Sequence, residues 1–320
     1  MATNPAQGAQ RGRTPSQVAV LGLAPLGVPL ELELIGGEPA GTLAAACARW
    51  RGVAEPSART LRLRMTLDHG LAGTGDAAIS FAGVCLELRG PGVEGRTEPL
   101  SGRAECRLSA AYLASPDALR AEVLEPLVLY LLARNGRAPI HAAGFLAGDH
   151  AILLAGASGA GKSSLARAAD QAGFPVLSED TIHVQLGPPP RVWGLPGPAH
   201  LLPADVPGEG GYPTRVRNGR TKYAVPLRTA AAQAVSAVPG PVCILRHGTA
   251  LALEPLSQDQ ALRRLAPLEE GFDRVAAAVH EAHGVLTARG AWQLTLSADP
   301  AEAIRFLVAN LARLSENPIR

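Results

Sequence analysis

The stretch AILLAGASGAGKSSLARAA, residues 151–169, decides the interpretation of the whole chain. Its first five residues are an apolar run of strand length, and the residues from Ser163 onward have the composition of a helix start. Between them, residues 156–163 match the pattern G-x-x-x-x-G-K-[ST]. A strand, a glycine loop and a helix in this order turn consecutive backbone N–H groups toward a phosphate at the helix N-terminus. The stretch therefore predicts a phosphate-binding P-loop.

The distribution of lysine supports this prediction. The chain has two lysines, Lys162 and Lys222, and arginine supplies the rest of its 30 Lys and Arg residues. Because the planar guanidinium does not replace a compact ammonium, a lysine kept in such a chain indicates a site that needs it. We expect Lys162 to reach the terminal phosphates of ATP. We expect Ser163 and Asp180 to hold Mg²⁺, directly or through water. The residues expected to bind the nucleotide are Gly156, Ala157, Ser158, Gly159, Ala160, Gly161, Lys162, Ser163 and Ser164.

Two acids follow the loop at short range. Residues 174–180, FPVLSED, predict an apolar strand that ends in Glu179 and Asp180. Carboxylates at the exit of a strand beside a P-loop can hold Mg²⁺ or accept the proton of an attacking hydroxyl. A Glu-Asp pair elsewhere would be an ordinary helix cap or solvated turn, and the nearby loop reverses that preference. His141 precedes the strand that leads into the loop and could reach the same phosphate, although a lone histidine is more often structural.

Taken together, residues 140–144 (IHAAG), the loop and residues 174–181 (FPVLSEDT) resemble the core of the HPr serine kinase superfamily, whose ATP domain is similar to that of phosphoenolpyruvate carboxykinase. The resemblance is closest to the HPr-kinase-related branch, which includes kinases acting on lasso-peptide precursors. It is specific over residues 140–186 and weaker over residues 192–256, where WGLPG and TKYAVPL occur. Over residues 18–139 it rests on arrangement alone. It implies that His141 lies near the transferred phosphate and that the tandem acids serve as catalytic base and metal partner.

The sequence departs from the family pattern in two places. Glu179 stands where the family usually has an aspartate, so whether Glu179 or Asp180 is the base stays open. The Glu-Ile-Arg-Gly-Leu-Gly signature of bifunctional HPr kinase/phosphorylases does not occur in the sequence. We therefore expect forward phosphorylation only, and an acceptor other than HPr.

The expected fold class is α/β, with an N-terminal α+β domain followed by a P-loop ATP-binding domain of the HPr kinase and phosphoenolpyruvate carboxykinase type. We expect a disordered tail over residues 1–17, the N-terminal domain over 18–137 and the kinase domain over 138–320. In the N-terminal domain, period-two alternation predicts strands within residues 30–34, 61–67 and 79–88, and a helix is expected near residues 40–50.

A second helix of the N-terminal domain has clear start and stop signals. Ser115-Pro116 opens it and Asn135-Gly136 ends it, with residues 137–139 as a hinge between the domains. The residues expected on its inner face are Leu119, Val123, Leu124, Leu127, Val128 and Leu131.

In the second domain we expect strands near residues 242–246 and 251–254. A helix capped by Ser257 and Gln260 should follow, then a last helix capped by Asp299 and Glu302. The apolar stripe of the last helix comprises Ile304, Leu307, Val308, Leu311 and Leu314. Residues 187–219 are rich in proline and glycine and lack strong periodicity, so they predict an irregular lid or binding loop.

Composition argues against several other classes of protein. A net charge of +2 without an arginine-rich block gives no reason to expect a nucleic-acid partner. The 4 cysteines are scattered, which argues against zinc and for buried reduced thiols. No apolar stretch is long enough to span a membrane and the N-terminus lacks a secretory pattern, so we expect a cytoplasmic protein. Whether the chain forms a homo-oligomer stays open.

The expected activity is transfer of the γ-phosphoryl group of ATP, with Mg²⁺, to a serine or threonine hydroxyl of a peptide or small protein. The acceptor is expected beneath residues 187–219. Four basic residues could bind the acceptor or the charge that develops during transfer: Arg215, Arg217, Arg220 and Lys222. The alternative is that they form only a solvated basic loop. A small-molecule or carboxykinase-like enzyme and an ATP-binding accessory module of peptide maturation remain alternatives. The sequence has neither the Asn-Lys-x-Asp motif of GTPases nor the Leu-Ser-Gly-Gly-Gln motif of ABC ATPases.

Overall fold

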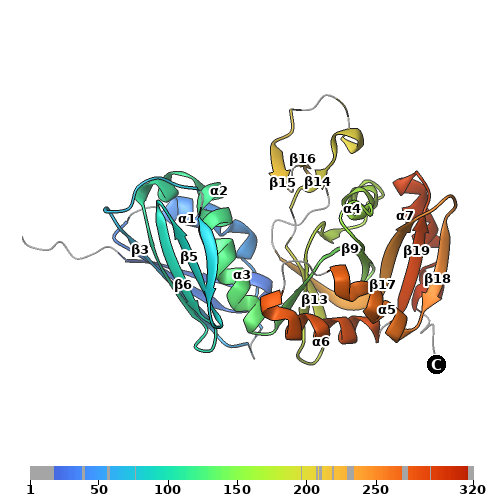
Figure 1. The fold of residues 1–320 in the computed structure, drawn as a ribbon, viewed down its shortest axis with the longest axis horizontal. Helices are drawn as coiled ribbons and strands as arrows, with labels where there is room; N and C mark the ends of the chain where they lie inside the picture. Colours follow the sequence, from blue (N-terminus) through green and yellow to red (C-terminus); the bar gives the residue numbers. More distant parts are fainter. Residues whose placement is uncertain are drawn as a thin grey trace, which may run out of the picture.

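The computed structural model contains two large sheets, each with its own helices, and a small third sheet (Figure 1). It describes residues 18–37, 40–55, 58–75, 77–195, 197–206, 208, 211–217, 220–228, 234–268, 273–288 and 290–315. The tail predicted over residues 1–17 lies outside these ranges. The mixed α/β class expected from the sequence is confirmed in this coarse form.

The first sheet has seven strands in the order β1-β2-β3-β7-β6-β5-β4. Its strands are β1 (Val18–Leu23), β2 (Leu30–Ile35), β3 (Leu61–Leu67), β4 (Ala78–Ala82), β5 (Cys85–Gly90), β6 (Val93–Glu98) and β7 (Arg103–Leu108). The alternation in β2 shows why the period-two segments were predicted well. Its leucines enter the core, while Glu31 and Glu33 stay outside and accept hydrogen bonds from Arg62 and Arg64 of β3.

A long helical segment covers this sheet beside α1 (Ala40–Ala46) (Figure 1). It consists of α2 (Pro116–Ala118), a π-helical segment (Leu119–Leu124) and α3 (Glu125–Arg134). The predicted start is confirmed, because Ser115 Oγ accepts a hydrogen bond from the Ala118 amide at 3.3 Å. All six residues predicted for its inner face are fully buried. Since Pro126 has no N–H and its ring crowds the preceding turn, the wider π-helical turn ahead of it is the expected adjustment.

The second sheet has nine strands, in the order β11-β9-β10-β17-β13-β12-β8 with β19 and β18 continuing from β17. They are β8 (Arg137–Ile140), β9 (Ala142–Ala147), β10 (His150–Ala155), β11 (Val176–Ser178), β12 (Ile182–Gln185), β13 (Arg191–Gly194), β17 (Val235–His247), β18 (Ala252–Leu256) and β19 (Ala291–Leu296). The strands β10, β17 and β19 run parallel to one another.

Helices cover both faces of this sheet. On one face lie α4 (Lys162–Gln171) and α7 (Pro300–Ala309), and on the other lie α5 (Gln258–Leu265) and α6 (Ala276–Thr287). Successive side chains of β10 enter these two cores in turn, with Leu153 in one and Leu154 in the other. A strand that is buried on both faces reads as a continuous apolar run, which is the pattern of residues 151–155.

The helix caps of the second part largely follow the prediction. Ser257 and Gln260 form a reciprocal capping box at the start of α5. Asp299 caps α7 by accepting from the Ala301 amide at 2.9 Å, but Glu302 instead accepts from Ser297 Oγ at 3.1 Å. In the predicted stripe, Ile304, Leu307 and Leu314 are buried and the other two are half-buried; Leu311 and Leu314 belong to a separate short helix, α8 (Leu311–Ser315).

Two expectations about loops are wrong. The predicted hinge at residues 137–139 is the buried strand β8, so the expected boundary between residues 137 and 138 falls inside a strand. Residues 187–219 are not irregular throughout, because they contain β13, β14 (Ala199–Leu201) and β15 (Thr214–Arg217). With β16 (Arg220–Val225), the last two form a three-stranded sheet in the order β14-β16-β15 that stands beside α4 (Figure 1). Those prolines of residues 187–219 that the structure describes lie outside the strands, where they remove no ladder hydrogen bond.

The two large sheets are joined by packing and by ionic contacts. Trp193 and Leu195 of the second part belong to the core of the first. The buried Arg137 donates to the Leu26 carbonyl oxygen at 2.9 Å and to the Glu55 carboxylate at 2.7 Å. A Cβ on Gly27 would lie 2.5 Å from the Trp193 ring, so only glycine permits this approach. The junction is therefore a packed interface.

The described residues include no helix long and apolar enough to cross a membrane. All four cysteines are free. Cys47, Cys106 and Cys243 are buried, and burial raises the pKa of each of these thiols to about 12. Cys85 is only half-buried. The expected reduced thiols are present, with burial complete at three of the four positions.

Candidate functional site

The glycine loop lies between a central strand and a helix N-terminus, as its sequence predicts. β10 ends at Ala155 and α4 begins at Lys162. Gly161 caps the helix with a φ of 98°, a conformation that favours glycine. A Cβ on Gly156 would lie 2.8 Å from Ala160 Cβ and 3.2 Å from Leu245 Cβ. The loop therefore needs a glycine where it packs against β17.

Lys162 is folded over its own loop. The residue is 6% exposed, and its ammonium donates to the carbonyl oxygens of Gly156 and Ala157. These contacts hold the charge at the mouth of the loop. An anion placed there would meet the ammonium and the positive end of α4 together.

Four residues singled out from the sequence come together beside this helix. Ser163 Oγ donates to Glu179 Oε2 at 2.6 Å. Asp180 follows directly, and its Oδ1 lies 3.7 Å from Nε2 of His141. The two acids differ in surroundings, since the side chain of Glu179 is 9% exposed and that of Asp180 is 37% exposed. Glu179 thus faces the start of α4, and Asp180 faces His141 and solvent.

A close strand contact fixes the position of these acids. They follow β11, and β13 passes beside β11 at Gly194. A Cβ at Gly194 would lie 2.1 Å from the Leu177 carbonyl oxygen, which is backbone and cannot move aside locally. Glycine at this position therefore allows the approach that places Glu179 and Asp180.

Sequence reasoning missed one member of the cluster. His200 on β14 places Nδ1 2.6 Å from Glu179 Oε1, so both carboxylate oxygens of Glu179 have partners. The strand β14 was not predicted, and His200 stands 21 positions from Glu179 with no motif around it. Only the folding of the small sheet against α4 brings the two side chains together.

Ser164 and Lys222, which are also predicted for the site, do not join the contacts of Ser163, Glu179, Asp180 and His141. Ser164 Oγ contacts Asp205 at 3.4 Å and does not join the Ser163–Glu179 pair. Lys222 on β16 lines the same cavity as the two acids. The side chains of Arg215, Arg217 and Arg220 lie outside the described part of the chain, so their expected role stays a prediction.

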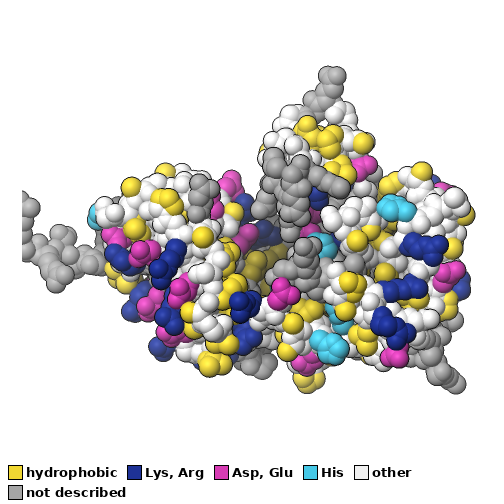
Figure 2. Space-filling view, in the orientation of Figure 1, with side chains coloured by type: hydrophobic (Ala, Val, Ile, Leu, Met, Phe, Trp, Pro, Cys, Tyr) yellow, Lys and Arg dark blue, Asp and Glu magenta, His cyan; other side chains and the backbone are white. Residues whose placement is uncertain are grey.

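The acids open into a cavity of about 600 Å³ between the two parts of the molecule. Figure 2 shows a hollow in this region with hydrophobic side chains on its wall. Its polar lining includes Ser178, Glu179, Asp180, His200 and Lys222. Its apolar wall includes Ile79, Phe81, Leu86, Leu129, Tyr130 and Val275.

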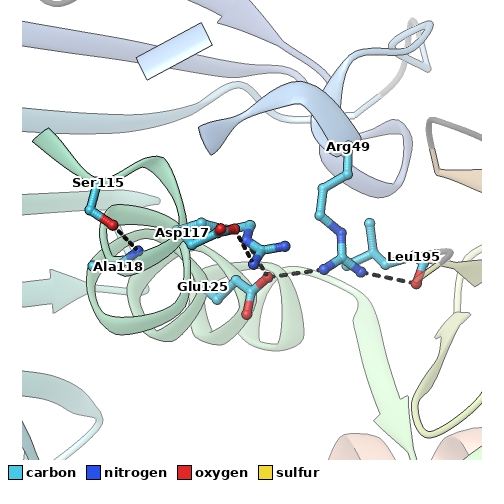
Figure 3. A network of polar contacts seen from close by, with 7 residues as sticks. Arg49, Ser115, Asp117, Ala118, Glu125 and Leu195 are labelled. Carbon is cyan, nitrogen blue, oxygen red and sulfur yellow. Dashed lines mark hydrogen bonds and ion pairs between the residues drawn. The ribbon is translucent and has the colours of Figure 1, made fainter. Parts of the chain in front are cut away.

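Arg49 ties the walls of this cavity together (Figure 3). Its guanidinium donates to Glu125 Oε1 at 3.1 Å and to the Leu195 carbonyl oxygen at 3.0 Å. Burial lowers the pKa of Arg49, and Glu125 opposes that effect. Through these two hydrogen bonds Arg49 links α3 to the segment that follows β13, so it holds the two sides of the cavity at a fixed separation.

The cavity wall also carries a titratable side chain, His183, that is uncharged. His183 on β12 is 3% exposed, and its Nδ1 has no hydrogen-bond partner among the described residues. Burial lowers the pKa of His183 to about 3, with smaller contributions from Arg49 and Arg137. This imidazole is therefore neutral. It lies on β12, the strand that comes next after the two acids in the chain.

The described residues contain no cluster of three or more His, Cys, Asp or Glu side chains arranged to hold a metal. Magnesium does not require such a cluster, because it keeps several waters and binds one or two carboxylates together with substrate phosphates. The hydroxyl of Ser163 beside the Glu179 carboxylate is an oxygen donor set of that kind. The residues present therefore fit Mg²⁺.

No family model and no curated protein matches the sequence. Among the solved structures that match is the HPr(Ser) kinase/phosphatase of Coxiella burnetii, at 12% identity and a TM-score of 0.31. That match covers 55% of this chain and 97% of the other. A TM-score this low does not establish a common fold.

Proposed function

We propose that this chain is an ATP-dependent kinase that phosphorylates a serine or threonine hydroxyl of a peptide or small protein. The observation that carries the proposal is the 2.6 Å hydrogen bond from Ser163 to Glu179, with Asp180 beside it. It joins a glycine loop of phosphate-binding pattern to two carboxylates at the mouth of a cavity. The loop, Lys162 and the α4 N-terminus would hold the triphosphate. The ATP-binding domain would then be of the HPr kinase and phosphoenolpyruvate carboxykinase type that the sequence resembles.

The different surroundings of the two acids support different roles. Glu179 is buried against Ser163 and His200, so it would hold Mg²⁺ with Ser163, directly or through water. Asp180 is the more exposed acid and lies near His141, so it would face the acceptor. We assign Asp180 as the base and Glu179 as the metal partner, in place of Asp180, which the sequence predicts to hold Mg²⁺ with Ser163. His141 would lie beside the γ-phosphate, where it orients the Asp180 carboxylate.

In this assignment the acceptor hydroxyl oxygen forms a bond to the γ-phosphorus, and the Asp180 carboxylate takes the hydroxyl proton. The bond from the γ-phosphorus to the oxygen bridging the β- and γ-phosphates breaks, and ADP leaves with that electron pair. Bound Mg²⁺ would neutralise phosphate charge. Lys162 would place its ammonium on the terminal phosphates, where charge builds during transfer.

The shape of the cavity favours a peptide acceptor over a small anionic metabolite. A small-molecule kinase would be supported by a tight anion-binding pocket around Lys222. The cavity beside Lys222 is instead about 600 Å³, with a mainly apolar wall that reaches α3. A pocket of this size and lining suits apolar groups better than a small, highly charged anion, so it would take the apolar side chains next to an acceptor hydroxyl.

The proposal is tested by incubating the full chain with ATP, Mg²⁺ and synthetic peptides encoded beside its gene, and reading intact mass. A phosphorylated peptide is the expected product with the wild-type protein. Asp180→Asn should keep ATP binding and lose about two to four orders of magnitude in turnover, as removal of a general base does. Unchanged turnover in Asp180→Asn would reverse the roles of the two acids. Failure of the wild-type protein to bind ATP would remove the proposal.

A further inference from the structure

The apolar wall of the cavity bears on which peptides the site would accept. Two of its side chains, Leu129 and Tyr130, come from α3 of the first part of the chain. Two more, Ile79 and Phe81, come from β4, and Ile79 is 50% exposed. These residues belong to a different sheet and helix from the loop and the acids, yet they line one continuous cavity with Glu179 and Asp180.

This wall remains exposed in the structure, which is unusual for side chains of this kind grouped together. Leu129, Tyr130 and Phe81 are each only half-buried, although they lie beside the fully buried core of the first part. Contiguous exposed apolar surface of this sort marks a binding site more often than it marks chance. Because the same cavity is lined by Glu179 and Asp180, a ligand bound to this apolar wall would also carry the acceptor hydroxyl.

The strand β4 favours an extended chain as the occupant. It is the last strand of its sheet, paired with β5 on one side and, among the described residues, with no strand on the other. Ile79 and Phe81 are two positions apart on β4, and both line the cavity. An edge strand with apolar side chains at alternate positions offers an extended peptide both backbone partners and side-chain contacts.

The charged side chains on the wall differ in their partners. Arg49 is paired with Glu125. Arg274 instead stacks its guanidinium 4.8 Å from the centre of the Phe81 ring, and this contact leaves its positive charge in place. The pKa of His183 keeps it neutral above acid pH. The cavity therefore offers mainly apolar contact, together with the positive charge of Arg274.

We infer that the acceptor is a peptide whose phosphorylated serine or threonine is flanked by large apolar side chains, and that these side chains lodge in the cavity lined by Ile79, Phe81, Leu129 and Tyr130. This inference rests on the proposed kinase function. It assigns the first part of the chain a role in acceptor specificity, while the second part supplies the nucleotide site. Burial of a leucine side chain is worth about 1.5–3 kcal/mol, or roughly a tenfold to hundredfold preference.

The test uses the full chain with ATP, Mg²⁺ and matched synthetic peptides that carry one central serine, flanked by leucine in one set and by alanine in the other. The leucine set should be phosphorylated with a kcat/KM about tenfold higher or more. In Ile79→Asn and Leu129→Asn the KM for leucine-flanked peptide should rise about tenfold, while the Kd for ATP measured by calorimetry stays at the wild-type value. The control is Leu100→Asn, because Leu100 is 81% exposed and does not line the cavity.

The outcomes separate this inference from the kinase proposal. Equal kcat/KM for the two peptide sets, or Ile79→Asn and Leu129→Asn variants that fold and keep the wild-type preference, would overturn the inference and leave the kinase function standing. ATP binding without transfer to any peptide would remove the peptide acceptor and with it this inference. Absence of both binding and transfer would remove the kinase function itself.

Discussion

The neutral, buried His183 makes stability depend on pH with a sign that follows from its surroundings. Its ordinary pKa is 6.5, and burial lowers it to about 3 in the folded chain. Between these values the unfolded state binds a proton that the folded state does not, so stability falls as the pH drops below 6.5 and stops falling near pH 3. The free energy of unfolding should fall by about 1.4 kcal/mol for each unit of pH within this window, or about 5 kcal/mol across it.

The assay is urea unfolding followed by tryptophan fluorescence at several values between pH 4 and pH 8, with linear extrapolation to water. We compare the wild-type protein with His183→Leu, which cannot titrate, and with the control His280→Gln, whose residue is exposed. Between pH 6.5 and pH 4.5 the wild-type protein should lose about 2–3 kcal/mol more than His183→Leu. His280→Gln should follow the wild-type curve. Parallel curves for wild type and His183→Leu would show that burial of this imidazole does not govern the acid side of stability.

Further predictions concern the acids, the strand contact and the small sheet. Glu179→Gln should raise the Mg²⁺ concentration needed for half-maximal turnover, measured by magnesium titration, because Glu179 is assigned to the metal; loss of turnover with unchanged magnesium dependence would instead make it the base. Gly194→Ala should lose about 1–3 kcal/mol in urea unfolding and much of its transfer activity, since the new Cβ meets the Leu177 carbonyl, whereas Gly187→Ala, which meets nothing within 4 Å, should behave as wild type. Amides of β14 and of residues 221–225 should exchange hydrogen more slowly when ATP and acceptor peptide are both present, if the small sheet closes over the acceptor; equal protection would leave it a structural element.

Local patterns were sufficient for much of the fold. The alternation of β2, the cap at Ser115 and the apolar run of β10 each depend on residues close in sequence, and each element forms where its pattern predicts. The same holds for the helix that follows the glycine loop. Mixed α/β architecture with several sheets follows from these elements.

Features set by distant contacts were missed. The strand β8 was interpreted as a hinge because Ala138-Pro139 looks like a breaker, yet Arg137 is anchored by Glu55 and the strand pairs with β12. Strands β14 and β15 were not predicted, because prolines flank them. No local sequence pattern indicates that they pair with β16. The contact of His200 with Glu179 was not predicted for the same reason, since it exists only because β14 lies against α4.

The candidate site shows the same division. Spacing predicted that Ser163 and the two acids lie close together, and the family resemblance added His141. In the structure Ser163 contacts Glu179, and Asp180 lies near His141. Spacing could not separate the roles of Glu179 and Asp180, since adjacent carboxylates differ only through what packs around them. It also could not reveal the cavity, because one of its walls is built from α3 and β4, far away in the chain.

The central claim is that residues 156–163 hold the phosphates of ATP through Lys162, and calorimetric titration of ATP with Mg²⁺ tests it most directly. The full chain and Asp180→Asn should both bind ATP, since Asp180 is assigned to the proton of the acceptor. Lys162→Ala should keep the circular dichroism spectrum of the wild type and bind ATP at least about tenfold more weakly, because it removes a charge-assisted contact worth roughly 1.5–3 kcal/mol. Equal affinity for ATP in Lys162→Ala and wild type would contradict the account.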